Sequence, residues 1–232
     1  MNFAALADDW QYLLWGSFPE GPPGGALLTL LLCGTSGVLS AIFGVVFGIA
    51  LVMGRGPMLH ALTAVLGFLR AIPVLMLIFW TYFLLPLLFG VDVPGLFSVV
   101  CALSLISGAY LAHGVAAGIR AIPSGQWQAG AALGMTRWQA LRFLILPQAL
   151  QVMLPSFVNQ WVTLIKDSSL AYIVGVGELS FLATQVNARL MVNPAEVFLF
   201  VGAVYWLLCS ALNLLAWAVE RRSGVGRMQG QG

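Results

Sequence analysis

Arg70, Lys166 and Asp167 are ionisable residues that lie within otherwise apolar segments of the chain. A charge at the centre of a membrane helix costs about 2.5 to 3.5 kcal/mol on insertion scales, so such a residue usually faces a partner or a water-filled cavity. In one interpretation, Asp167 neutralises one of the cations and fixes the packing of two helices. In the other, one cation attracts an anionic solute, because a carboxylate needs charge-assisted donors in order to leave water.

The depth of these charges follows from helix geometry. Counted from Leu59 along a continuous helix, Arg70 falls about 16 Å into the membrane, which is near its midplane. Asn159 and Gln160 are expected to be buried, where they either join helices by hydrogen bonds or line the path of a solute, the first role being favoured. The candidate path residues are Arg70, Pro73, Asn159, Gln160, Lys166, Asp167, Ser168 and Ser169.

Catalytic and metal-binding chemistry has little support. A nucleophilic site needs a base beside the nucleophile, and the two histidines, His60 and His113, have no nearby acid in the sequence. The three cysteines have no CxxC spacing, so neither a disulfide framework nor a metal site is indicated. The sequence has no phosphate-cradling G-x-x-x-x-G-K-[ST], so ATP chemistry would belong to a partner. We therefore expect a protein that is not an enzyme.

The composition predicts an integral membrane protein. Apolar residues make up 60% of the 232 residues and charged residues 8%, with a mean hydropathy of +0.95. In soluble domains about a quarter of the residues are charged. The charges form no clustered basic face, which argues against a nucleic-acid partner.

Apolar runs long enough to cross about 30 Å of hydrocarbon predict an all-α fold with five spans. The runs are 25–53, 59–88, 96–119, 148–170 and 197–219, and prolines predict kinks in the second. Together they form a membrane domain over 25–219.

Three longer segments lie outside the spans and the loop, and the first of them, 1–24, is expected outside the cytoplasm. Residues 1–24 precede the membrane domain, a stretch at 174–192 is expected at the membrane surface, and the tail 220–232 is expected to be disordered. Asn193, Pro194 and Glu196 suit the N-cap, N1 and N3 positions of the last helix.

The loop 120–147 is the longest polar interruption within the membrane domain. Gly134 can adopt a left-handed conformation, so a helix over 126–133 should end there. Thr136 is placed to cap a second helix that runs until Pro147, with Trp138, Leu141 and Ile145 on one face. Small residues from Ala129 to Ala132 let another protein surface approach the first helix closely. The loop is predicted to be a docking element; the alternative is an ordinary amphipathic loop helix.

The arginines predict the orientation, because basic residues accumulate on the cytoplasmic side of short loops. An N-terminus outside the cytoplasm leaves only Arg189 outside. It places inside Arg55, Arg120, Arg137, Arg142, Arg221, Arg222 and Arg227. The loop and the C-terminus are therefore expected in the cytoplasm.

The run Gln128-Ala129-Gly130, followed by Gly134 and Ile145-Leu146-Pro147, resembles the coupling loop of importer permeases of the ATP-binding-cassette (ABC) class. That loop reads E-A-A, three residues, G, and about nine residues to I-x-L-P. Gln128 replaces the family's Glu, which removes the basis for a salt bridge from this position to the ATPase. The resemblance implies the type I ABC importer permease fold, with five transmembrane helices and a cytoplasmic coupling helix between spans three and four. It implies coupling roles for Gln128, Ala129, Gly130, Ala132, Leu133, Gly134, Arg137 and Trp138.

Further landmarks resemble those of polar amino-acid permeases. They are Leu69 to Pro73, the run GQW at Gly125, LPQA at Leu146, Lys166 to Leu170, and Glu178-Leu179. The run from Arg70 to Met76, with Trp80, Tyr82 and Pro86, is most similar to glutamate/aspartate importer permeases. This similarity implies import of an acidic amino acid, with glutamine, histidine and arginine as alternatives.

The third span departs from the family pattern A-Y-x-A-E-x-x-R. His113 and Ala116 stand where that pattern has its acid and its arginine. Either a paralogous partner supplies these charges in a heterodimer, or the selectivity is altered. His113 is interpreted as a hydrogen-bonded packing residue rather than a proton relay.

The resemblance also implies an assembly in the bacterial inner membrane. It comprises a second permease subunit, either a paralogue or a second copy, two cytoplasmic ATPases that bind ATP and Mg²⁺, and a periplasmic amino-acid-binding protein. This chain would bind no cofactor itself, and alternating access would operate at a midplane site near Arg70 and Lys166. An ion-coupled transporter that works without an ATPase is the alternative of a different class, with Asp167 binding a cation, but it leaves the loop without a purpose.

Overall fold

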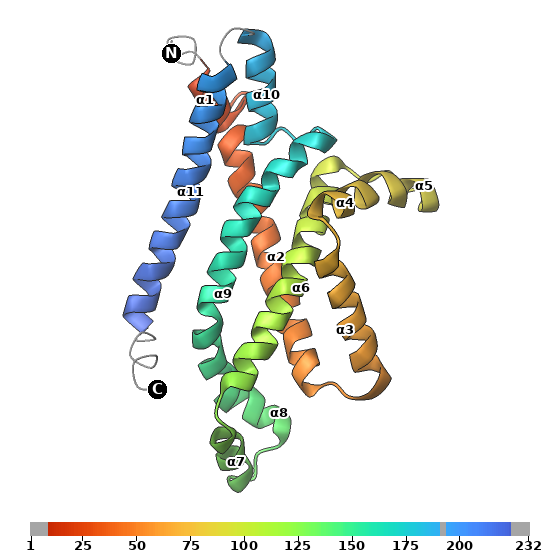
Figure 1. The fold of residues 1–232 in the computed structure, drawn as a ribbon, viewed down its shortest axis with the longest axis vertical. Helices are drawn as coiled ribbons and strands as arrows, with labels where there is room; N and C mark the ends of the chain where they lie inside the picture. The colour runs from red at the N-terminus through yellow and green to blue at the C-terminus, as the bar shows by residue number, and fades with distance from the viewer. Residues whose placement is uncertain (1–8, 191–193, 224–232) are drawn as a thin grey trace. The chain divides into compact units, whose positions relative to one another are not determined.

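A computed structural model of the chain describes residues 9–190 and 194–223, and these residues form helices joined by turns (Figure 1). In chain order the α-helices are α1 (Trp10–Trp15), α2 (Gly25–Met53), α3 (Gly56–Ala71), α4 (Val74–Phe79), α5 (Leu85–Phe89), α6 (Gly95–Ala121), α7 (Ser124–Ala132), α8 (Arg137–Ala140), α9 (Leu146–Asp167), α10 (Leu179–Leu190) and α11 (Pro194–Ser223). Two π-helical segments, Trp80–Leu84 and Leu141–Ile145, and a 3₁₀-helix, Ser168–Val174, continue or join them.

The chain divides into two compact units. The first unit comprises Met1–Val38, Ile72–Ser104 and Trp161–Leu212, and the second comprises Leu39–Ala71, Leu105–Gln160 and Asn213–Gly232. The long helices α2, α6, α9 and α11 therefore contribute residues to both units.

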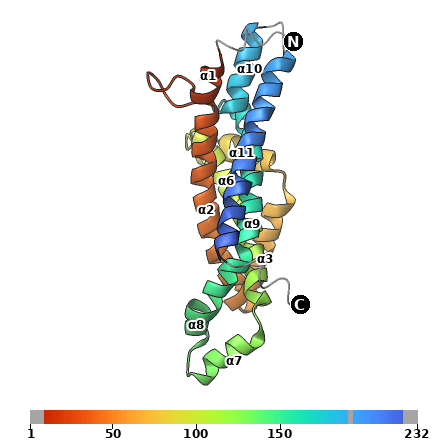
Figure 2. The same cartoon turned by 90° about the vertical axis from the view of Figure 1, so that its left-hand side faces the viewer.

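The core of the first unit joins α1, the start of α2, α10 and the start of α11, which lie together in both ribbon views (Figures 1 and 2). Leu13 of α1 and Leu179 of α10 are fully buried in this core. The backbone closes the same junction, because the amide of Gly25 donates to the carbonyl oxygen of Gly177 at 2.9 Å. The fold thus ties the segment before the first long helix to α10.

The second unit is built on a close contact between α2 and α6. A Cβ atom added at Gly44 would lie 2.5 Å from the Cβ of Leu111, and one added at Gly48 would lie 2.5 Å from the Cβ of Val115. Glycines four residues apart let two membrane helices approach more closely than larger residues allow. Leu66 of α3 is buried against the same pair of helices.

The helices follow the predicted spans, with one correction. Among the described residues, four helices are long and apolar enough to cross a membrane, and α2 has the bounds predicted for the first span. The expected second span, 59–88, is not one helix: Gly56–Ala71 and Val74–Phe89 meet at an angle of 104°. Pro73 explains the break, because a proline disfavours helical conformation in the residue before it and cannot donate a backbone hydrogen bond.

The expected end of the second loop helix at Pro147 is also wrong. Helical structure continues from Arg137 to Val174, and Pro147 lies in the first turn of α9. The π-helical segment Leu141–Ile145 directly precedes this proline. A π-helical turn shifts the hydrogen-bonding register, which accommodates a ring that would otherwise clash with the preceding turn.

The segments predicted to lie outside the spans agree with the structure only in part. The stretch expected at 174–192 contains α10. Helix α11 begins at Pro194, the predicted N1 position, and continues to Ser223, so residues 220–223 of the expected tail are helical. Asn193 and residues 224–232 lie outside the described residues.

Candidate functional site: the loop helices and the polar residues of the long helices

The turn between α7 and α8 is fixed by backbone hydrogen bonds. Gly134 has φ +73°, as predicted, and its amide donates to the carbonyl oxygen of Ala131 at 3.0 Å. The amide of Met135 donates to the carbonyl oxygen of Gly130 at 3.0 Å. These two bonds form a Schellman motif, which satisfies carbonyl groups at the end of α7. The sharp reversal of the chain is therefore encoded locally.

Helix α8 begins with a reciprocal cap. The amide of Gln139 donates to Oγ1 of Thr136 at 3.2 Å, and the amide of Thr136 donates to Oε1 of Gln139 at 2.8 Å. This is a capping box. The role of Thr136 was predicted from the sequence but that of Gln139 was not, although the T-x-x-Q spacing carries the signal.

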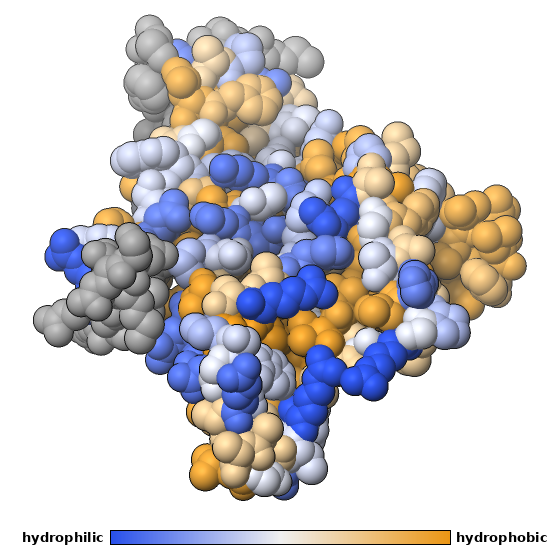
Figure 3. All heavy atoms as spheres, turned by 60° about the horizontal axis from the view of Figure 1, so that its bottom comes forward, coloured by the Kyte–Doolittle hydropathy of each residue, from blue (hydrophilic) through white to orange (hydrophobic). Residues whose placement is uncertain are grey.

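The two loop helices pack through their smallest residues. Gly130 is buried, and a Cβ atom added there would lie 3.1 Å from the Cβ of Ala140. The remaining candidate coupling residues are exposed: Gln128, Ala129, Ala132, Leu133, Gly134, Arg137 and Trp138. Figure 3 brings this end of the second unit forward and shows hydrophilic side chains gathered beside hydrophobic ones.

Trp138 differs in exposure from the two residues that were predicted to share its face of the helix. Leu141 and Ile145 are fully buried, whereas Trp138 is 52% exposed. The helix is α-helical before Leu141 and π-helical from that residue onwards. The change in residues per turn rotates the faces of the helix relative to one another.

Helix α6 leads directly into the loop and is held on two sides. A Cβ atom added at Gly118 would lie 2.3 Å from Cγ of Met153 on α9, so these helices are in close contact. Arg120 donates through Nη2 to the carbonyl oxygen of Leu51 at 3.3 Å. The guanidinium thus caps the C-terminal end of α2, where cations are favourable.

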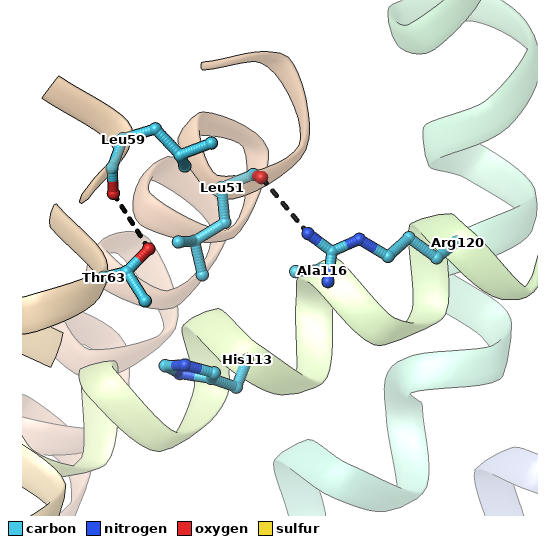
Figure 4. Close-up of a pocket in the computed structure, with 6 residues that line it drawn as sticks. All are labelled: Leu51, Leu59, Thr63, His113, Ala116 and Arg120. Carbon is cyan, nitrogen blue, oxygen red and sulfur yellow. Dashed lines mark hydrogen bonds between the residues drawn. The ribbon is translucent and has the colours of Figure 1, made fainter. Parts of the chain in front are cut away.

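A pocket of about 240 Å³ lies in the second unit between α2, α3 and α6 (Figure 4). Its lining comprises Leu51, Leu59, Thr63, His113, Ala116 and Arg120. His113 contacts the carbonyl oxygen of Ala109 through Nδ1 at 3.0 Å, which agrees with its interpretation as a hydrogen-bonded residue. This pocket was not predicted from the sequence, although a spacing of seven residues places His113 and Arg120 on one face of α6.

Arg70 lies at a helix end rather than deep within a continuous span. It occupies the last turn of α3, just before the 104° break, and its side chain is exposed. Cζ of Arg70 is 5.0 Å from the centre of the Tyr110 ring, and the Tyr110 hydroxyl donates to the Arg70 carbonyl oxygen at 3.2 Å. Pro73 precedes α4 with φ −61° and ψ 139°. The assumption of an unbroken helix through Arg70 was therefore wrong, and its position near the midplane of the membrane stays a prediction.

Lys166 and Asp167 also lie at a helix end, in the last turn of α9 in the first unit. Lys166 is exposed, and Asp167 is half-buried. The hydroxyl of Ser168 donates to the carbonyl oxygen of Ile165 at 2.7 Å, and that of Ser169 donates to the carbonyl oxygen of Lys166 at 2.6 Å. Both hydroxyls therefore bond their own helix. Within the described part of the chain, Asp167 forms no ion pair with a lysine or arginine.

Asn159 and Gln160 differ in burial. Asn159 is exposed, contrary to the expected burial. Gln160 is half-buried and donates through Nε2 to Oγ of Ser107 at 3.2 Å, which links α9 to α6. This contact supports the helix-joining role for Gln160.

A buried carboxylate organises the junction in the first unit. Glu178 is fully buried, and its oxygens accept hydrogen bonds from the amides of Ser180 and Phe181 and from the hydroxyl of Tyr205, each at 2.9 Å. Removal from water raises the pKa of Glu178 to about 7, although the three donors oppose that effect. The carboxylate thus caps α10 and holds α11.

Helix α1 was not predicted. Its Tyr12 hydroxyl donates to Oε1 of Gln185 on α10 at 3.0 Å, and Asp9, just before the helix, forms an ion pair with Arg189 at 3.5 Å. The apolar residues of α1 carried a signal, but the segment is too short for the span-length criterion that organised the prediction.

A family model described as "Binding-protein-dependent transport system inner membrane component" matches residues 25–225. The chain belongs to this family. The match contains all of the long helices and both loop helices. As a permease of this family, the chain is a multi-pass inner-membrane protein and not an enzyme, and hydrolysis of ATP belongs to a partner ATPase.

The named relatives of the chain are permeases of amino-acid transport systems. The permease is 34% identical over 189 residues to the L-cystine transport system permease protein TcyB of Bacillus subtilis (strain 168), covering 80% of each chain. It is 30% identical over 220 residues to the glutamate/aspartate import permease protein GltK of Escherichia coli O157:H7, covering 90% of this chain and 97% of the relative. The chain is therefore a permease of an amino-acid ABC importer.

A solved structure shows the same fold. The chain in the "Crystal structure of an amino acid ABC transporter with histidines" superposes with a TM-score of 0.83 at 24% identity, covering 96% of the permease and 99% of that chain. This confirms the predicted type I permease fold, in which the bent pair of helices counts as one of five spans.

Proposed function

We propose that the permease couples ATP hydrolysis in partner subunits to the uptake of a polar amino acid, with glutamate and aspartate as its first candidate substrates. The observation that carries the coupling role is the rigid reversal at Gly134, which presents the exposed face of α7 on a locally encoded turn. The ATPase would bind ATP and Mg²⁺, and α7 would follow its closure.

The proposed movement passes from α7 into α6 and α9. The contact between Gly118 and Met153 holds these helices together, and Gly44 and Gly48 hold α6 against α2. Packed interfaces of this kind respond to force by moving as bodies rather than by deforming continuously. A displacement of α7 would therefore rock the helices of the second unit and alternate the access of solute to the membrane path.

The arginine distribution supports a cytoplasmic loop, a cytoplasmic C-terminus and an N-terminus outside. In this orientation, cytoplasmic ATPases would contact the loop, and a periplasmic binding protein would deliver solute from the opposite side. Two ATPase subunits and a second permease subunit, identical or paralogous, would complete the importer.

The preference for an acidic solute rests on exposed cations. Arg70 and Lys166 are both exposed and belong to different units, and we propose that each can attract a solute carboxylate independently of the other. In the second unit, Arg120 uses Nη2 for Leu51, and a guanidinium has four further N–H donors for a solute carboxylate. The pocket that contains Arg120 is a candidate binding place.

Uptake by proteoliposomes that contain the complete importer and its binding protein tests the substrate. Labelled glutamate, aspartate, cystine, glutamine, histidine and arginine are compared with and without ATP. Uptake confined to glutamate and aspartate supports the acidic preference. Uptake of cystine or of a neutral or cationic amino acid instead contradicts that preference and leaves the importer role intact.

Gly134→Val tests coupling. A β-branched residue is strained at φ +73°, so the turn should open, and solute-stimulated ATPase activity should fall while the binding protein still docks. Gly125→Val on α7 is the matched control, because nothing lies within 4 Å of a Cβ atom added at either glycine and only Gly134 has positive φ. Equal coupling in the two variants would contradict the role of the turn.

A further inference from the structure

All of the charged residues in the loop 120–147 are positive. It contains Arg120, Arg137 and Arg142 and no Asp or Glu. Arg120 donates to Leu51, whereas Arg137 and Arg142 are exposed and neither forms an ion pair with any residue in 9–190 or 194–223. The loop therefore offers two cations to whatever binds it, and it offers no anion.

Both cations are held against aromatic rings. Cζ of Arg137 lies 6.0 Å from the centre of the Trp127 ring on α7, and Cζ of Arg142 lies 5.4 Å from the centre of the Phe143 ring. A guanidinium stacked on a ring is partly ordered before it binds, so less side-chain entropy is lost when a carboxylate takes its donors. The arrangement favours recognition of carboxylates.

Large apolar side chains accompany the arginines on the same helical hairpin. Leu133, Trp138 and Phe143 are 75%, 52% and 64% exposed. Buried apolar anchors beside charged groups are the usual composition of a protein interface core and its rim. A surface made only to lie on water would not need these three side chains.

We propose that this surface, Leu133, Arg137, Trp138, Arg142 and Phe143, docks into a groove of the ATPase that is walled by carboxylates and floored by apolar residues. The inference rests on the proposed coupling function and specifies the chemistry of the partner. Gln128 is exposed and uncharged, so it forms no ion pair with a basic residue of the ATPase. Electrostatic attraction between the loop and the ATPase then requires anionic groups on the ATPase that face the arginines of the permease.

Anionic lipid headgroups are the competing occupant, because they also attract juxtamembrane arginines. Three features favour the protein groove. The exposed apolar residues are distributed along the hairpin with the arginines, Leu133 follows α7 directly, and the reversal at Gly134 holds α7 and α8 as one packed element.

Association of the ATPase with the assembled permease provides the first test. Binding is measured in nanodiscs of phosphatidylcholine and in nanodiscs with added phosphatidylglycerol. Arg137→Glu and Arg142→Glu should each weaken binding about tenfold or more in both lipids, and the salt dependence of binding should decrease. Arg55→Glu is the matched control, because Arg55 is exposed in the same unit but lies outside the loop.

A second test identifies the partner group. The Arg137→Lys variant keeps the charge and adds an amine, which a carbodiimide joins to a neighbouring carboxylate as a zero-length amide. Mass spectrometry should find the amide on an Asp or Glu of the ATPase. Loss of ATPase binding only in phosphatidylglycerol, or no amide to the ATPase, overturns the inference in favour of lipid or of an uncharged groove.

Failure of the inference is separable from failure of the proposed function. If Leu133→Asp and Gly134→Val impair ATPase binding or coupling while both arginine variants behave like Arg55→Glu, the docking role stands and the acidic groove is wrong. If none of these variants affects the ATPase, the docking role itself is wrong.

Discussion

Glu178→Gln should remove a pH dependence from the stability of the permease. The carboxyl group is fully buried, and its pKa is raised from 4.5 to about 7, mainly by loss of water. A difference of about 2.5 between the pKa values of the unfolded and folded states corresponds to about 3 kcal/mol, at 1.36 kcal/mol for each pKa unit. The folded state binds the proton more tightly than the unfolded state does.

The sign of the effect follows from this difference. Below pH 4.5 the carboxyl is protonated in both states, and the stabilisation by the bound proton is fully present. As the pH rises from 4.5 through about 7, the unfolded state ionises first, so the free energy of unfolding falls. Above pH 7 the contribution is lost, and only the hydrogen bonds from Ser180, Phe181 and Tyr205 remain to support the carboxylate.

Thermal unfolding of the purified permease in nanodiscs measures the effect. The melting temperature is recorded between pH 5 and pH 8 for the native protein and for Glu178→Gln, and the difference between the two curves isolates this carboxyl from other titrating groups. The native protein should lose stability relative to the variant as the pH rises. The side-chain amide of the variant also points an N–H group at a hydrogen-bond donor that the carboxylate accepted from. This should lower the free energy of unfolding by about 1 to 3 kcal/mol at all pH values. Parallel curves would refute the reasoning.

Three further substitutions test the packing and the path. Gly48→Val should lower the melting temperature, because a Cβ atom there meets Val115 at 2.5 Å and overpacking costs about 1 to 3 kcal/mol; Gly67→Val, with nothing within 4 Å, is the control and should have little effect. Thr136→Ala should destabilise the start of α8 by about 1 kcal/mol, seen as faster hydrogen exchange in 136–140, and unchanged exchange would argue against the cap. Arg70→Ala should abolish uptake in an assembled complex, whereas loss of assembly would make Arg70 structural.

The loop shows how far local sequence can determine structure. The positive φ of Gly134 and the cap by Thr136 depend on hydrogen bonds between residues a few positions apart, so their residue types are sufficient to predict them. The difference in exposure between Trp138 and its predicted face-mates Leu141 and Ile145 was not predictable in the same way. It depends on a π-helical segment that begins three residues later, and helical periodicity alone does not reveal such a segment.

Arg70 illustrates the opposite case. Pro73 signals a disturbance, and the length of the apolar run, sufficient for one span, favours a kink there rather than a break. The 104° break and the contact with Tyr110, forty residues away, place Arg70 at a helix end. No local pattern contains the information for that contact.

The sequence by itself determined the class of the protein, the long apolar helices and the turn of the loop, because hydropathy and short-range hydrogen bonds act over neighbouring residues. Only the tertiary structure decided which polar groups share an environment. The capping of α2 by Arg120, the pocket beside His113 and the burial of Glu178 all join residues from separate helices. Their energies depend on the removal of water and on distances between those helices, and these quantities exist only in the folded chain.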